Sequence, residues 1–177
     1  MNEIVKKNGI TYGIITGVVS ILITTLIYTI DLKLFTSVWV GLANILFYII
    51  IGVVLLMKTK KELNGVFPFK DAFTTYFISA LIGILISVAF NIILFNFIDP
   101  AAKETIKELT IQYAVEMMEK FGAPSSAVNE AIKGMEKNDQ FSIIELVKGS
   151  FVTIAFSAVF GLILAAIFKS KNTNQGF

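Results

Sequence analysis

Four carboxylates in one polar segment are the residues of this sequence best suited to acid–base chemistry: Asp99, Glu104, Glu108 and Glu116. A catalytic pair would need two of them held side by side, with a shifted pKa. Their helical spacing is more simply explained as the solvated face of a helix. The chain has no Cys and no His, which excludes thiolate nucleophiles, imidazole catalysis and metal sites built from those residues. We therefore predict no enzyme activity, no catalytic residue, no cofactor and no metal site.

Three amides lie at the candidate polar-contact positions within otherwise apolar stretches: Asn44, Asn91 and Asn96. They could contact a small substrate. The more ordinary role of an amide in a membrane is a hydrogen bond between helices, worth roughly 0.6 to 2 kcal/mol. Charged residues inside membrane spans usually mark proton relays and ion paths, and these stretches contain none. A proton-coupled pump is therefore not expected.

Long uncharged stretches hold these amides in a sequence that is 55% hydrophobic, with a mean hydropathy of +0.77. Each stretch is long enough to cross the hydrocarbon core as a helix, which takes about 20 residues. Only helices satisfy the backbone within one segment in lipid. We predict an all-α integral membrane protein, a four-helix transmembrane bundle forming a single domain over residues 1–177. Its spans are residues 9–30, 34–57, 72–98 and 149–168, and residues 99–148 form a helical insert.

The first span has one alternative reading, a cleaved signal peptide. Its uncharged run is longer than the roughly 7 to 15 apolar residues of a signal peptide, and no small-residue cleavage motif follows it. We therefore favour a retained span.

Lysine placement predicts the orientation of the spans. The N-terminus, the second loop and the tail carry lysines at high density, whereas acidic residues dilute those of the insert. Because lysine-rich segments stay on the cytoplasmic side, both termini are predicted to be cytoplasmic in a bacterial cell membrane. A formal net charge of +2 is too weak for a nucleic-acid binder. The predicted partner is the lipid bilayer, with no nucleic acid.

Small residues recur every four positions in three of the spans, where they would let helix backbones approach closely. We favour packing within one chain, while a homo-oligomer or a protein partner held through the same stripes is the alternative. The stripes are Gly9, Gly13 and Gly17; Ser79, Gly83 and Ser87; and Gly149, Thr153, Ser157, Gly161 and Ala165.

The insert is predicted to form an amphipathic helical hairpin outside the membrane. Asp99 followed by Pro100 is a strong helix-start signal, and Gly122 is expected to end the first helix after Phe121. A second helix starts near Ser126 and runs to Lys137. The apolar face of the first helix could lie on the membrane surface, pack on the spans, or bind a partner. That candidate face consists of Ile106, Leu109, Tyr113, Met117 and Phe121.

The order and spacing of several short motifs resemble a family of small bacterial membrane proteins, the domain of unknown function 4199. The resemblance covers nearly the whole chain. It implies a four-span bundle in a bacterial cytoplasmic membrane and carries no activity, cofactor or site residue. The motifs are the glycine-rich first span from Tyr12-Gly13 to Gly17, the segment from Asn64-Gly65 through Phe67, Phe69-Lys70 and Ala72-Phe73, the Phe97-Ile98-Asp99-Pro100 exit, and a last span ending at Lys169.

We therefore predict a non-enzymatic multi-pass membrane protein, acting in envelope assembly or as an accessory subunit. A small oligomeric transporter or channel is the alternative, and it would need a site built from Asn44, Asn91 and hydroxyl groups. An enzyme that uses the acidic insert is the weakest of the three.

Overall fold

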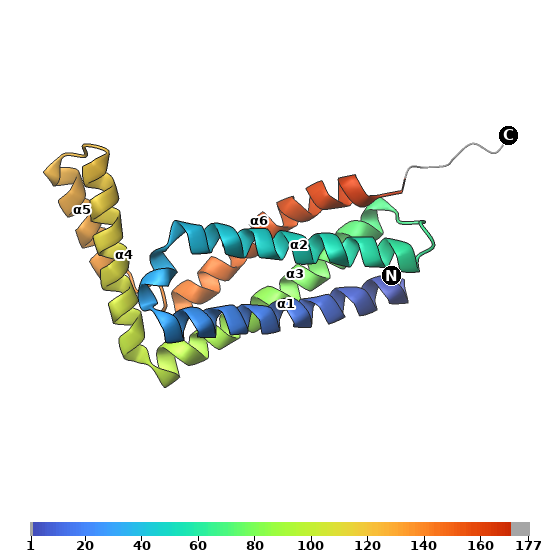
Figure 1. Cartoon of the computed structure of the whole chain (residues 1–177), viewed down its shortest axis with the longest axis horizontal. Helices are drawn as coiled ribbons and strands as arrows, with labels where there is room; N and C mark the ends of the chain where they lie inside the picture. The colour runs from blue at the N-terminus through green and yellow to red at the C-terminus, as the bar shows by residue number, and fades with distance from the viewer. Residues whose placement is uncertain (1, 171–177) are drawn as a thin grey trace. The chain divides into compact units, whose positions relative to one another are not determined.

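A computed structural model describes residues 2–170 and shows an all-α chain (Figure 1). Four helical segments are long and apolar enough to cross a membrane, namely α1, α2, α3 continued by η2, and α6. This confirms the predicted multi-pass all-α fold. The elements are α1 (Glu3–Ile30), the 3-10 helix η1 (Leu32–Thr36), α2 (Val38–Glu62), α3 (Phe69–Ile93), the π-helix η2 (Leu94–Ile98), α4 (Pro100–Lys120), α5 (Ser125–Lys137) and α6 (Ile143–Phe168).

The start of the second span differs from the sequence-based expectation. The uncharged stretch begins at Leu34, whereas α2 begins at Val38. The intervening residues belong to η1, whose first turn is capped because the Asp31 side chain accepts a hydrogen bond from the Lys33 amide. Ser37 is extended and ends that turn, so the α-helix can start only after it. The positions of charged residues do not reveal this local capping. The connector η1 therefore extends into the uncharged stretch that begins at Leu34.

The chain forms two compact units. Among residues 2–170, unit 1 comprises the chain up to Ser20, Asn44–Ser87, and the chain from Ser150 to Ser170. Unit 2 comprises Ile21–Ala43 and Val88–Gly149. Unit 1 therefore holds the larger parts of α1, α2, α3 and α6, and unit 2 holds η1, η2, α4 and α5.

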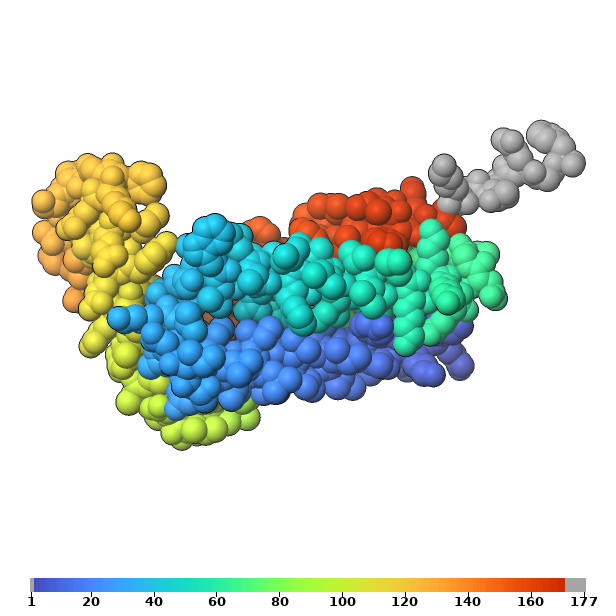
Figure 2. All heavy atoms as spheres, in the orientation of Figure 1, coloured from blue at the N-terminus to red at the C-terminus, as the bar shows by residue number. Residues whose placement is uncertain are grey.

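Unit 1 is organised by very close contacts between α1 and α3. A Cβ placed on Gly13 would lie 2.7 Å from the Cβ of Ile82, and one placed on Gly17 would lie 2.6 Å from the Cβ of Ile86. Real side chains do not approach so closely, so only glycine fits at these positions. The first predicted small-residue stripe therefore serves packing within the chain. In Figure 2 the spheres of α1 and α2 lie next to each other in unit 1, where the Asn8 side chain of α1 donates to Thr59 and Glu62 of α2.

The third predicted stripe is used in part. A Cβ on Gly161 of α6 would lie 2.7 Å from the Tyr76 ring, and one on Gly52 of α2 would lie 2.8 Å from the same ring. Tyr76 of α3 thus sits in a slot formed by the glycines of two helices. By contrast, a Cβ on Gly149, at the start of the stripe, would have no atom of another segment within 4 Å.

The loop that follows α2 is fastened to the end of α6. Phe67 is fully buried and packs with Leu56, Ala72, Leu164 and Ala165. The Phe67 amide donates to Ser170 Oγ at 3.1 Å, and the Ser170 amide donates to the Phe67 carbonyl at 2.8 Å. This reciprocal pair and the buried ring fix the loop beside the last described residue of the chain.

Unit 2 is built around aromatic packing at the ends of the spans. Phe35 of η1, Phe95 of η2 and Phe141 before α6 form one group, with ring centroids of Phe95 and Phe141 4.4 Å apart. Ala102 and Ile106 of α4 are buried against this group. Within unit 2, Figure 1 shows the chain turning sharply from η2 into α4, which contacts both η1 and α5.

Replacing Gly17 by alanine should destabilise the protein, because the added methyl would overlap Ile86. We expect a loss of about 1–3 kcal/mol, the usual cost of overpacking. The measurement is the unfolding midpoint of the purified protein in mild detergent. The matched control is Gly41→Ala in α2, where nothing lies within 4 Å of the new methyl. Equal midpoints for the two variants would show that the α1–α3 contact does not hold the bundle together.

Candidate functional site

The candidate site is the region where α4 and α5 join the ends of the spans, because two of the sequence-predicted polar residues, Asn96 and Asp99, make their hydrogen bonds there. Asp99 lies between η2 and α4, and we call the region around it the corner of unit 2. Its carboxylate accepts a hydrogen bond from the Tyr28 hydroxyl at 2.7 Å and from the Ala102 amide at 3.1 Å. One side chain therefore caps α4, as predicted, and also ties it to the end of α1. The hydrogen bond from Tyr28, followed by that from the Ala102 amide, lowers the pKa of Asp99.

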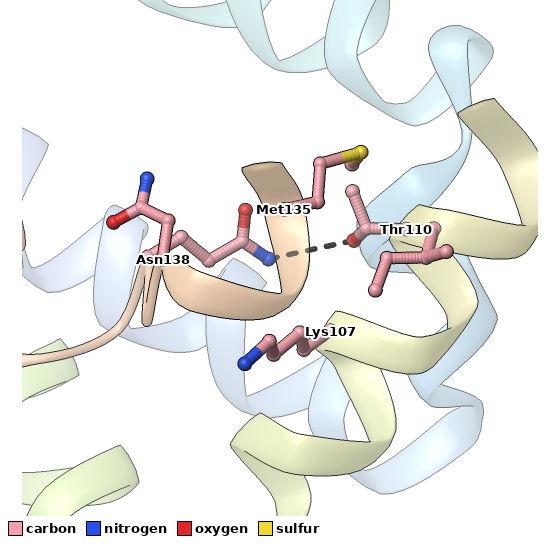
Figure 3. Close-up of a pocket in the computed structure, with 6 residues that line it drawn as sticks. Lys107, Thr110, Met135 and Asn138 are labelled. Carbon is pink, nitrogen blue, oxygen red and sulfur yellow. Dashed lines mark hydrogen bonds between the residues drawn. The ribbon is translucent and has the colours of Figure 1, made fainter. Parts of the chain in front are cut away.

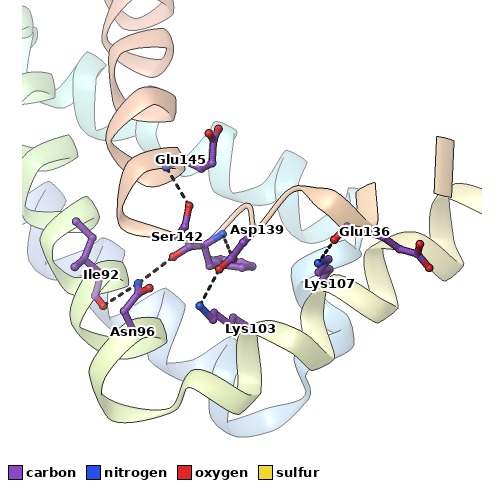
Figure 4. A network of polar contacts seen from close by, with 9 residues as sticks. Ile92, Asn96, Lys103, Lys107, Glu136, Asp139, Ser142 and Glu145 are labelled. Carbon is purple, nitrogen blue, oxygen red and sulfur yellow. Dashed lines mark hydrogen bonds and ion pairs between the residues drawn. The ribbon is translucent and has the colours of Figure 1, made fainter. Parts of the chain in front are cut away.

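Asn96 fastens the same corner to the start of α6. Its side-chain amide donates to the Ile92 carbonyl at 3.2 Å and to the Phe141 carbonyl at 2.9 Å (Figure 4). Phe141 lies 45 residues further along the chain, and its ring belongs to the aromatic group of unit 2. Asn96 therefore bridges segments within the protein, the ordinary role expected of such an amide.

Two lysines of α4 hold the end of α5. Lys103 forms an ion pair with Asp139 at 2.8 Å, and Lys107 donates to the Glu136 carbonyl at 2.5 Å (Figure 4). The second contact places a cation on a carbonyl at a helix C-terminus, where the helix dipole favours it. Burial raises the pKa of Asp139, but hydrogen bonds from Lys103 and from the Phe141 amide outweigh burial, so that pKa is lowered overall.

A small cavity opens between α4 and α5 beside these contacts (Figure 3). Its volume is about 150 Å³, and Gln140 closes one side by donating to Thr110 Oγ1 at 3.4 Å. Ligand pockets usually measure about 300–1,000 Å³. The cavity is therefore too small for most metabolites. Its lining residues are Lys107, Thr110, Ile111, Met135, Asn138 and Gln140.

The predicted apolar face of α4 is divided by the fold. Ile106 is 1% exposed and belongs to the core of unit 2. Leu109, Tyr113 and Met117 are half-buried. Phe121 is 83% exposed, because α4 ends at Lys120 and Phe121 is its C-cap, followed by Gly122 with φ +72°. Ile106, Tyr113 and Met117 are thus the less exposed part of the predicted face, and Phe121 is its exposed end.

The predicted carboxylates are not brought together. Glu104, Glu108 and Glu116 are exposed on α4, and Asp99 pairs with a tyrosine. Within residues 2–170 no group of three His, Cys, Asp or Glu side chains could hold a metal ion. This arrangement offers no paired carboxylates for proton transfer at the corner.

The remaining two amides differ from Asn96. Asn91 has an interaction partner in the structure. The side-chain oxygen of Asn44 is buried, and among the described residues it has no hydrogen-bond partner. Such a buried acceptor usually costs about 1–3 kcal/mol, which makes Asn44 the exception among the polar groups of the spans.

Sequence reasoning missed a polar cluster in unit 1. Asn8 is 3% exposed, and its side chain donates to Thr59 Oγ1 at 3.2 Å and to Glu62 Oε2 at 2.7 Å. Lys58 lies 5.5 Å from the centre of the Tyr12 ring and 3.9 Å from Glu62. Asn8 and Glu62 each lie near the end of an uncharged stretch, and this was the signal for a polar contact there. Their pairing itself could not be predicted, because the two residues are 54 positions apart.

Comparison with known families gives a match over most of the chain. The family described as protein of unknown function (DUF4199) matches residues 11–170. No curated protein and no solved structure matches the chain.

Acid should weaken the corner of unit 2, because both Asp99 and Asp139 have lowered pKa values in the folded protein. A lowered pKa contributes stability above the unfolded value, about 3.9 for Asp, and that contribution is lost as pH falls below it. We expect the unfolding midpoint to fall between about pH 5 and pH 3, and to fall less in the Asp99→Asn/Asp139→Asn variant. Glu130→Gln, at an exposed carboxylate of α5, is the control. The idea fails if the double variant and the control show the same pH dependence.

Proposed function

Because the chain belongs to the DUF4199 family of proteins of unknown function, we propose its role from its own geometry. It is a non-enzymatic multi-pass membrane protein that acts as an accessory or assembly subunit of the cell envelope. The observation that carries this proposal is the braced α4–α5 hairpin at the ends of the spans. The hairpin is the one sizeable polar element among the described residues, and a partner would bind there.

The contacts that hold the hairpin support a role in which its surface is presented to another protein. Lys103, Lys107 and Gln140 join α4 to the last turn of α5 and to the segment after it. Asp99 and Asn96 hold the hairpin base to α1 and to the segment just before α6. The outer side of α5 is exposed and carries both signs of charge, including Glu130, Lys133 and Lys137. A surface that is already ordered loses little conformational freedom on binding. Such a surface suits recognition of another protein.

A non-enzymatic role is supported by what the corner residues do. Asp99, Asp139, Lys103 and Asn96 each have structural partners. The neighbouring cavity measures about 150 Å³, which is small for a substrate. The charged groups best placed for chemistry are therefore engaged in holding the hairpin.

Both termini are proposed to lie in the cytoplasm, in a bacterial cytoplasmic membrane. Unit 1 supports the shared side, because Asn8 near the N-terminus bonds to Glu62 and the Phe67 loop bonds to Ser170. Those three segments carry lysines at high density, which favours the cytoplasmic side.

A small oligomeric transporter or channel is the second candidate, favoured by the unpartnered oxygen of Asn44. A polar solute that donated a hydrogen bond to this oxygen would remove the cost of burying it. Solute flux through the purified protein in vesicles distinguishes the two candidates.

Single cysteines should report the orientation, since the chain has no cysteine of its own. In intact cells, a membrane-impermeant thiol reagent should label Ser126→Cys on α5. It should leave Asn2→Cys and Asn64→Cys unlabelled until the cells are opened, because exposed residues at the cytoplasmic side are out of its reach. The reverse labelling pattern would invert the proposed topology.

A photo-crosslinking residue at Lys133, on the exposed side of α5, should capture one discrete protein in living cells. The control is the same residue at Leu46 of α2, which is 59% exposed and faces outward from an apolar span. We expect an adduct of constant size from position 133 and none from position 46. If positions 129, 130 and 133 all give no adduct while the protein is inserted, the accessory role is refuted.

A further inference from the structure

Helix α4 has three distinct faces, and each meets a different environment. Lys103, Lys107 and Thr110 face the end of α5 and the segment after it, where their hydrogen-bond partners Asp139, Glu136 and Gln140 lie. Successive residues are rotated by about 100° around a helix. Glu104, Glu108 and Glu119 therefore lie about a third of a turn away, and all three are exposed. The third face begins with the buried Ala102 and Ile106 and continues through Leu109, Tyr113 and Met117.

The contacts of Ala102 and Ile106 show which way the third face points. Both pack in the cluster that contains Leu94 and Phe95 of η2, with Tyr28 of α1 and Leu32 and Phe35 of η1 against it. These elements are the ends of candidate membrane spans and the connector between two of them. The third face of α4 is therefore turned toward the membrane side of the hairpin.

Beyond Ile106 the third face is half-buried and lies outside the two hydrophobic core clusters. Among the described residues, Leu109, Tyr113 and Met117 belong to neither hydrophobic cluster of the protein. Lys120 follows Tyr113 by seven residues and so lies on the same side of the helix. Phe121, 83% exposed, stands just past the helix end. The third face therefore continues along α4, away from the span ends, as an apolar strip. The strip ends at the Lys120 side chain and the exposed Phe121 ring.

We propose that this strip, Leu109, Tyr113, Met117, Lys120 and Phe121, rests on the headgroup layer of the same bilayer that the spans cross. An interfacial helix buries its apolar side about 5–10 Å into the boundary between headgroups and acyl chains. Tyr113 and Lys120 suit that depth, because an apolar stem enters the acyl region while the hydroxyl or ammonium group reaches a lipid phosphate. The inference is independent of the proposed accessory role.

Charge and continuity select lipid as the occupant. The glutamates at positions 104, 108 and 119 are turned away from the strip, which keeps most of the negative charge of α4 away from lipid phosphates. Glu116 lies at the edge of the strip and is exposed. Trp39, in the first turn of α2 just after η1, is 81% exposed, and exposed tryptophans favour the membrane interface. Lipid at that level is continuous with the lipid around the span ends, where α4 starts.

The test places a tryptophan on each of two adjacent α4 residues. The only native tryptophan is removed as Trp39→Phe, and the background then receives either Tyr113→Trp or Gln112→Trp. Gln112 is exposed and lies about 100° around the helix from Tyr113. The full-length proteins are reconstituted in phosphatidylcholine vesicles with and without brominated acyl chains. We expect the Tyr113→Trp protein to emit at shorter wavelength and to be quenched several-fold more strongly than the Gln112→Trp protein.

Equal quenching of the two tryptophans, or a water-exposed emission from both, would overturn the proposal. Protection of Tyr113→Trp from aqueous iodide without bromine quenching would also overturn it, because protein and not lipid would then cover the strip. Met117→Trp provides a second probe if tryptophan at position 113 prevents insertion. Its expected behaviour is the same, and failure of bromolipid quenching there counts equally against the proposal.

Discussion

The fold depends on close approach of α1 and α3, because apolar helices in lipid gain nothing from hiding apolar surface from water. Gly13 and Gly17 remove the side chains that would keep α1 away from Ile82 and Ile86. Dispersion contacts and short helix separation then replace the hydrophobic effect as the source of cohesion. Close packing against glycine recurs at Tyr76, whose ring occupies the space beside Gly52 and Gly161.

Polar groups of this chain are concentrated where the apolar helices end. Asn8, Thr59 and Glu62 form one such group in unit 1, and Tyr28, Asn96 and Asp99 form another in unit 2. At these levels a hydrogen bond is strengthened by partial exclusion of water, yet the charged partner keeps some contact with it. Both groups join segments that lie far apart in the sequence. These hydrogen bonds therefore hold distant segments of the chain in place.

The hairpin shows how one helix can serve three environments. If α4 were an amphipathic helix with a single packing face, it would pack against one neighbouring segment only. Lysines toward α5, glutamates toward water and apolar residues toward the span ends give α4 a defined rotation about its own axis. Fixing that rotation also fixes which residues of α5 remain exposed.

The four helices, the start of α4 at Asp99-Pro100 and the glycine stripe of α1 were predictable from sequence, because backbone satisfaction in lipid and local capping act over a few residues. The rotation of each helix was not, since it depends on distant contacts such as that of Asn96 with the Phe141 carbonyl. Spacing grouped Phe121 with Ile106 on one apolar face, and only the tertiary structure shows that the Ile106 side chain is buried while the Phe121 ring is exposed. Sequence alone determined that this chain is a helical membrane protein with one polar hairpin. Only tertiary structure decided which polar residues are already partnered, because hydrogen bonds and packing between distant segments set exposure, and local periodicity carries no record of them.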